Sequence, residues 1–99
     1  MPILLDENAV AGALATVPGW TREQAEIVRT FKFHSYMAGV EFVNQVARLA
    51  EEANHHPDIQ LGWRKVTVRL STHSKGGLTE LDFELARKVD GVGEAVCDG

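Results

Sequence analysis

Three of the four histidines in this 99-residue chain lie in two short segments. His55 and His56 precede Pro57 where a long helical pattern stops, and His73 follows Thr72 where a strand pattern stops. Histidine has an unperturbed pKa of about 6.5, which makes it the side chain best suited to move protons near neutral pH. Ends of helices and strands are where a rigid scaffold usually presents reactive groups. The sequence therefore predicts acid–base chemistry, provided that the two segments meet in the fold.

The same histidines have two simpler interpretations. A His-His-Pro sequence taken alone is more often a turn than a site. Three histidines are also a ligand set for zinc, but adjacent histidines rarely bind one ion together and the HExxH spacing is absent. We therefore expect no metal here. The fourth histidine, His34, is expected to cap or pack at the start of the long helix.

Composition and charge narrow the class of protein. The length fits one domain, with 44% hydrophobic and 24% charged residues as in a soluble globular protein. The net charge of −4 argues against nucleic acid as a direct partner, because a phosphate backbone favours a basic patch. With Cys97 as the one cysteine, we expect neither an internal disulfide nor a Cys-based metal site. We find neither a membrane span nor a signal peptide and expect a cytoplasmic protein.

Apolar residues spaced three or four apart predict helices over residues 6–16, 35–53 and 79–89. Asp6 and Ser35 are the expected N-caps of the first two helices. Thr79 is the expected N-cap of the third, with Asp82 in place of glutamate in its capping box. Gly91 follows the last helical pattern and is expected to close it.

Period-two patterns predict a short extended segment from Trp20 onward and strands over residues 26–33, 58–63 and 65–72. The strands come as two hairpins in the order α-β-β-α-β-β-α, so we expect an α+β domain with a four-stranded antiparallel sheet and three helices on one face. Residues 1–99 then form a single domain, with residues 91–99 as a frayed tail. The apolar stripe of the long helix, which includes Tyr36 and Met37, and the aromatic Trp63 make a dimer plausible.

Several motifs occur together at fixed intervals. They are Glu51-x3-His55-His56-Pro57, Val66-x-Val68-x-Leu70-x-Thr72-His73 and Gly77-Leu78-Thr79-x2-Asp82, with Pro18-Gly19-Trp20 and Phe31-x-Phe33 upstream. Over roughly Leu5 to Val89, the chain closely resembles the pterin-4a-carbinolamine dehydratase family. It departs from better-known members at Asn54, where an aspartate often precedes the histidines, and at Lys75-Gly76, where some members carry Cys-Ala.

The resemblance implies an enzyme that dehydrates 4a-hydroxytetrahydrobiopterin, or a bacterial pterin equivalent, to the quinonoid dihydropterin and water. This step regenerates the cofactor of aromatic amino-acid hydroxylases, so a functional link to such a hydroxylase is implied. The resemblance further implies no metal, no cofactor beyond the pterin substrate, and a homodimer or homotetramer. A non-enzymatic dimerisation or assembly module of the same fold is the alternative; the presence of all three histidines favours the enzyme.

Loss of water from a carbinolamine needs an acid to protonate the 4a-hydroxyl and a base to take a proton from a ring nitrogen. Histidines supply both roles at neutral pH if their environments differ. By resemblance, His55, His56 and His73 are the catalytic set. We assign His55 and His73 to the acid and base roles, and His56 to binding and orienting the pterin.

Substrate contacts are expected from Pro57, Thr72, Ser74, Lys75, Glu51, Asp82 and Trp20. Glu51 lies one helical turn before His55, a spacing at which its carboxylate can bond the imidazole and fix its tautomer. Glu51 is equally well explained as a solvated helix residue. Asp82 either caps its helix, faces the pocket, or does both. Trp20 either flanks the pocket or belongs to the core.

Overall fold

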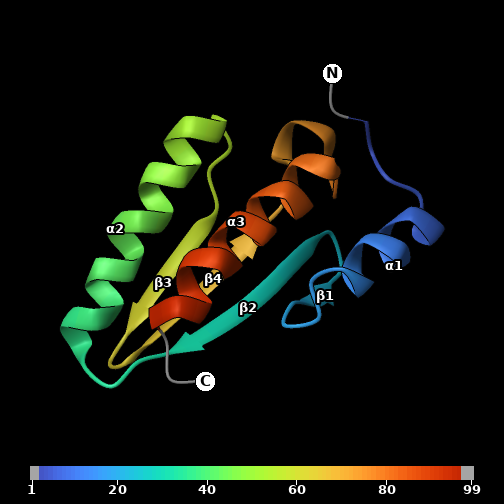
Figure 1. Cartoon of the computed structure of the whole chain (residues 1–99). Helices are drawn as coiled ribbons and strands as arrows, with labels where there is room; N and C mark the ends of the chain where they lie inside the picture. Colours follow the sequence, from blue (N-terminus) through green and yellow to red (C-terminus); the bar gives the residue numbers. More distant parts are fainter. Residues whose placement is uncertain (1–2, 97–99) are drawn as a thin grey trace.

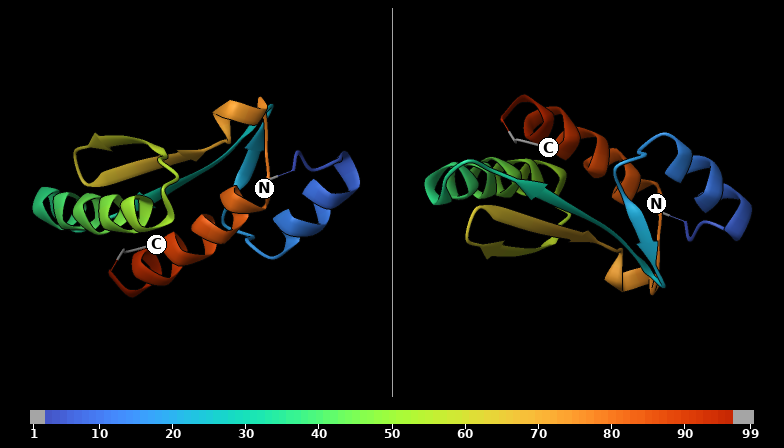
Figure 2. Two further views of the ribbon diagram at one scale, coloured as in Figure 1. Left: turned by 90° about the horizontal axis from the view of Figure 1, so that it is seen from above. Right: turned by 90° about the horizontal axis from the view of Figure 1, so that it is seen from below.

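Three helices cover one face of a four-stranded antiparallel sheet (Figures 1 and 2). The computed structural model describes residues 3–96, with side chains as far as Glu94. Its elements are α1 (Glu7–Ala15), β1 (Thr21–Glu23), β2 (Glu26–Lys32), α2 (Tyr36–Ala53), β3 (Asp58–Gly62), β4 (Lys65–Leu70), the 3-10 helix η1 (His73–Lys75) and α3 (Glu80–Val96). The strands lie in the order β1-β2-β4-β3, and each neighbouring pair is antiparallel. The predicted α+β class and the order of elements are confirmed.

Side-chain caps fix where the first two helices begin. Asp6 accepts a hydrogen bond from the Ala9 backbone N–H at 2.8 Å, and Ser35 accepts one from the Ala38 N–H at 3.1 Å. Both are the predicted N-caps. α2 ends at Asn54, whose backbone is left-handed at φ 51° and ψ 43°. Asparagine adopts this conformation more readily than most residues, so the helix ends where the sequence predicts.

The last helix is longer than predicted. The sequence predicts an end at Gly91, but α3 continues to Val96, so this boundary and the frayed tail over residues 91–96 are wrong. Tertiary packing outweighs the low helix propensity of glycine here. A Cβ atom at Gly93 would lie 2.5 Å from the Phe31 ring, so the missing side chain lets α3 pack directly against β2. Cys97 lies outside the described residues.

The core lies between the sheet and helices α2 and α3. Its largest fully buried side chains include Ile27, Phe31, Val66, Val68 and Leu70 from the sheet, with Phe42, Val46, Phe83, Leu85 and Val89 from the two helices. Tyr36 and Met37, predicted in the apolar stripe of α2, are 47% and 61% exposed. They lie outside the buried face of α2, which is formed instead by Gly39, Phe42, Val46 and Ala50.

Arg29 places a charge on the apolar face of β2, and acidic side chains of α3 pair with that charge. Its Nη1 donates hydrogen bonds to Asp90 at 2.8 Å and to Glu94 at 3.1 Å. The Trp20 indole N–H donates to the same Asp90 oxygen at 2.8 Å. Burial raises the pKa of the Asp90 carboxyl, and the Trp20 hydrogen bond and the Arg29 charge offset only part of that rise. The cluster ties β2 to the last turns of α3.

Replacing Arg29 by leucine is expected to destabilise the fold by about 3 kcal/mol, because the Asp90 carboxylate stays buried without its cation. The melting temperature at pH 7 should fall by roughly 10–20 °C for a domain of this size. A carboxyl whose pKa is raised in the folded state favours folding when protonated, so the deficit should shrink as pH falls through that pKa. Thermal unfolding at pH 7 and at a series of lower pH values measures both the loss of stability and its dependence on pH. The double variant Arg29→Leu, Asp90→Asn should recover much of the loss, and a single variant that melts with the wild type would contradict the account.

Candidate active site

The end of α2 separates the two neighbouring histidines. After the left-handed Asn54, the His55 backbone N–H donates to the Ala50 carbonyl at 3.1 Å and folds the chain back against the helix. The His55 side chain is only 10% exposed, whereas the His56 side chain is 56% exposed. The two rings therefore point in different directions, with His55 inward and His56 toward solvent.

A buried carboxylate joins the two histidine-bearing segments. His55 Nε2 lies 2.6 Å from Oδ1 of Asp82, whose side chain is fully buried. The other oxygen, Oδ2, accepts a hydrogen bond from the Thr72 hydroxyl at 2.8 Å. His73 follows Thr72 directly, and the end of α2 lies at the same end of the molecule as the loop before α3 (Figure 1). The two segments predicted from the sequence therefore meet.

The loop after β4 presents His73 at the surface. His73 opens the 3-10 helix η1, and the side chains of His73, Ser74 and Lys75 are exposed. The Thr72 N–H donates to the Gly77 carbonyl at 2.9 Å, which closes the loop around this single turn. The exposed residues of the loop are therefore held by a strand end whose own side chain bonds the buried carboxylate.

Glu51 contacts a different histidine from the one predicted. Its Oε2 lies 2.5 Å from His56 Nε2, so the predicted bond to His55 is wrong. The left-handed Asn54 takes His55 off the helical path and brings His56 near the last turn of α2. The Glu51 and His56 side chains are 77% and 56% exposed, so solvent screens this pair and it adds little to stability.

Two predicted substrate contacts have structural roles. The structure places Trp20 in the core, where it is 3% exposed and bonds to Asp90 rather than to the histidine group. Thr72 is 4% exposed, and its hydroxyl is directed at Asp82 rather than at the surface. Pro57 follows His56 and is half-buried, so part of its surface remains exposed for the predicted contact to the substrate.

Thr79 does more than the sequence predicts. Its backbone N–H donates to Asp82 Oδ2 at 2.9 Å, so the Asp82 half of the predicted capping box is confirmed, whereas the Thr79 hydroxyl accepts from the Leu81 N–H instead of the Asp82 N–H. Its hydroxyl lies 2.8 Å from the Thr72 hydroxyl and is fully buried, a contact that sequence patterns do not indicate. The sequence does contain one signal. A capping box uses only part of the hydrogen-bonding capacity of a carboxylate, so a buried Asp82 needs a further hydrogen-bond donor. The sequence could not name that donor, because His55 lies 27 positions away.

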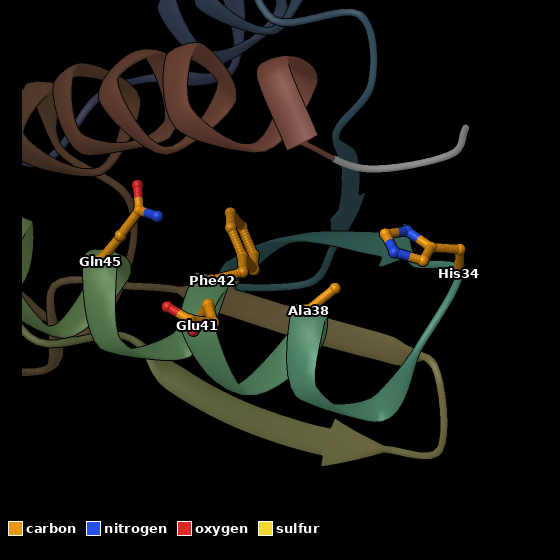
Figure 3. A pocket seen from close by; sticks show the side chains of 5 residues that line it. All are labelled: His34, Ala38, Glu41, Phe42 and Gln45. Carbon is orange, nitrogen blue, oxygen red and sulfur yellow. The ribbon is translucent and has the colours of Figure 1, made fainter.

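A separate cavity lies at the other end of α2. It has a volume of about 450 Å³ and is lined by His34, Ala38, Glu41, Phe42 and Gln45 (Figure 3). The 18 residues of α2 span roughly 25 Å, so this cavity is remote from the group at the opposite end of the helix. His34 therefore does not belong with the other three histidines.

The arrangement leaves one nitrogen of each ring for other partners. Carboxylates engage Nε2 of His55 and Nε2 of His56, which leaves the two Nδ1 atoms for acid–base or binding contacts. A carboxylate partner orients an imidazole and selects its tautomer. The end of α2 therefore carries one fixed, largely buried imidazole and one exposed imidazole, with the exposed His73 on the adjoining loop.

Residues 3–96 contain no cluster of three or more His, Cys, Asp or Glu side chains arranged to hold a metal ion. In the same range, none of the helices has the length and apolar character needed to cross a membrane.

The chain matches known proteins over nearly its whole length. The family model described as pterin 4 alpha carbinolamine dehydratase matches residues 3–92. The chain belongs to this family. A relative from Roseiflexus castenholzii that carries the name pterin-4-alpha-carbinolamine dehydratase is 49% identical over 90 residues, which cover 91% of this chain and 97% of the relative. One of the same name from Nocardia farcinica is 51% identical over 87 residues, which cover 88% and 92%.

Two solved structures share the fold of this chain. A transcriptional coactivator/pterin dehydratase from Brucella melitensis superimposes with a TM-score of 0.88 at 35% identity, covering 92% of this chain and 99% of that one. A pterin dehydratase-like protein identified as a RuBisCO assembly factor in the alpha-carboxysome superimposes with a TM-score of 0.61 at 27% identity, covering 75% and 86%. The same fold therefore occurs both in a protein described as a pterin dehydratase and in one described as an assembly factor.

Proposed function

We propose that the chain dehydrates a 4a-hydroxytetrahydropterin to the quinonoid dihydropterin and water, and so recycles the cofactor of an aromatic amino-acid hydroxylase. One observation carries the proposal. The buried Asp82 bonds His55 and, through the Thr72 hydroxyl, also holds the strand end that bears His73. Membership of the pterin dehydratase family supports the same class of substrate.

The reaction needs two proton movements. Hydroxide is a poor leaving group, so an acid protonates the 4a-hydroxyl as the C4a–O bond breaks and water departs. A base takes the proton of a ring N–H, and the electron pair of that bond completes the quinonoid system. The reaction is balanced by one proton delivered and one proton removed, without an oxidant or reductant. Acid–base help of this kind typically contributes about 10²–10⁴-fold to the rate.

The three histidines divide these roles. His55 is held by a buried carboxylate and His73 stands on an exposed turn, so their environments differ, as an acid and a base working at one pH require. His56, bonded to Glu51 at the surface, binds and orients the pterin. Further contacts to the pterin are proposed for Pro57, Ser74, Lys75 and the backbone of Thr72.

The protein is also proposed to act as a cytoplasmic homodimer or homotetramer. β3 lies at an edge of the sheet, with β4 as its neighbour, and an edge strand offers backbone groups to another strand. Leu61 and Trp63, on β3 and its turn, are 36% and 74% exposed. An interface between copies would cover this apolar surface.

An assembly factor without catalytic activity is the second candidate. The observation in its favour is the likeness to the RuBisCO assembly factor, at 27% identity. Such a role needs a surface but not a proton-transfer group. The presence of His55, His56 and His73, together with the buried carboxylate that orients one of them, favours the enzyme.

The dehydration of a 4a-hydroxytetrahydropterin, generated by a phenylalanine hydroxylase, tests the proposal. We expect micromolar protein to accelerate the decay of the adduct. Treatment with a strong chelator should leave that acceleration unchanged, because the residues assigned here move the protons without a metal. Decay at the spontaneous rate would reject the dehydratase. Activity that chelation abolishes and zinc restores would replace the acid–base mechanism with a metal-dependent one.

A further inference from the structure

A buried chain of hydrogen bonds runs from the start of α3 to His55. The Leu81 backbone N–H donates to the Thr79 hydroxyl oxygen at 3.2 Å, and that hydroxyl lies 2.8 Å from the hydroxyl of Thr72. Thr72 in turn donates to Asp82 Oδ2 at 2.8 Å, and Asp82 Oδ1 meets His55 Nε2 at 2.6 Å. Thr72, Thr79 and Asp82 are 4%, 0% and 0% exposed, so water does not compete for these bonds.

The number of hydrogens sets the direction of the chain. Each threonine hydroxyl has one hydrogen to donate. Thr72 gives its hydrogen to Asp82, so the bond between the two hydroxyls must be donated by Thr79. Because the Thr79 oxygen already receives the Leu81 N–H, every donor in the chain points toward the carboxylate.

The Asp82 carboxylate is the acceptor at the end of this directed chain. Oδ2 accepts two hydrogen bonds, from the Thr72 hydroxyl and the Thr79 N–H. A carboxylate oxygen has no hydrogen to donate, so the bond between Oδ1 and His55 Nε2 uses a hydrogen carried by the ring.

We infer that Thr72 and Thr79 are positioning residues whose hydroxyls hold the proton of neutral His55 on Nε2 and make Nδ1 its reacting nitrogen. The catalytic part of this inference rests on the proposed dehydratase function, whereas the tautomer does not. The cap of α3 consists of the Thr79 N–H with the Asp82 carboxylate and the Leu81 N–H with the Thr79 hydroxyl, and it does not include Thr72. Within residues 3–96, the Thr72 hydroxyl bonds only to Asp82 and Thr79, so its contribution is separable from helix capping.

The tautomer of His55 can be measured in the free protein by NMR of ¹⁵N-labelled histidine rings. In the wild type, we expect the neutral His55 ring to be protonated on Nε2. The near-isosteric Thr72→Val variant should show a mixture of tautomers, whereas Thr72→Ser should restore the wild-type pattern. The remote His34 ring serves as an internal control and should give the same signals in all three proteins. A wild-type ring protonated on Nδ1, or an unchanged tautomer in Thr72→Val, would overturn the inference.

Kinetics separate positioning from a merely structural role. Thr72→Val should lower kcat for dehydration by about tenfold with little change in KM, because it removes a hydrogen bond to a charged group without removing a substrate contact. Thr72→Ser should return kcat to within a few-fold of wild type. A Thr72→Val enzyme with wild-type kcat would overturn the catalytic part of the inference. If the wild type itself has no dehydratase activity but shows the expected tautomers, the proposed function fails and the positioning stands.

Discussion

The His55→Gln variant is expected to dehydrate a 4a-hydroxytetrahydropterin at least about a hundredfold more slowly than the wild type, because a positioned acid or base contributes at least that factor. Glutamine is chosen because its side-chain N–H can occupy the place of Nε2 and still donate to Asp82. The buried carboxylate then keeps a donor, so the melting temperature should change little. The variant therefore removes proton transfer while it preserves the hydrogen bond seen at 2.6 Å.

Two comparisons make the His55 result specific. His34→Gln is the matched control, because His34 lines the cavity at the other end of α2 and should keep the wild-type rate. His55→Ala should lose as much activity as His55→Gln and also lose stability, since it leaves Asp82 without the imidazole donor. A folded His55→Gln protein with a rate within about twofold of wild type would remove His55 from the mechanism.

Replacing Asp82 by asparagine is expected to lower both activity and stability. The new amide must point its NH₂ group either at His55 or at the donors from Thr72 and Thr79. The first orientation forces His55 Nε2 to accept and moves its hydrogen to Nδ1, which inverts the tautomer. The second orientation points the NH₂ group at the donors from Thr72 and Thr79 in a fully buried place, which costs about 2 kcal/mol. We expect kcat to fall by about a hundredfold or more, as when the orienting carboxylate of a catalytic histidine is lost.

The Asp82 prediction has its own control on the same helix. Glu84 is exposed on α3, so Glu84→Gln makes the same change of carboxylate to amide without touching the buried group. It should leave kcat and the melting temperature at wild-type values. Rates are measured by adduct decay and stability by thermal unfolding, on the same preparations. An Asp82→Asn protein with the activity of Glu84→Gln would show that the carboxylate does not act through His55.

Local patterns in the sequence are enough to predict most of the fold. The spacing of apolar residues and the caps at Asp6 and Ser35 place α1 and α2 within one residue of where they begin. The exception is the end of α3, where Gly91 predicts a stop but the helix continues to Val96. Two residues further on, Gly93 meets Phe31 across the core, and no local pattern contains that contact.

The candidate site is less accessible to sequence reasoning, because its bonds join distant positions. The residue types and the turn at the end of α2 are visible in the sequence, and so is Asp82 as a cap. The hydrogen-bond partners of these residues are not visible in the sequence. A single left-handed residue, Asn54, exchanges the expected pairing so that Glu51 meets His56 and leaves His55 to Asp82. A prediction from helical spacing holds only for residues on one helix, and His55 no longer lies on the helical path.

The proposed dehydratase function is measured by the decay of a 4a-hydroxytetrahydropterin at increasing concentrations of chelator-treated wild-type protein. We expect a rate that rises in proportion to the protein concentration and saturates with adduct. The same concentration of His55→Gln should stay near the spontaneous rate. A wild-type protein that leaves the spontaneous rate unchanged at every concentration would reject the dehydratase and leave the assembly role as the remaining candidate.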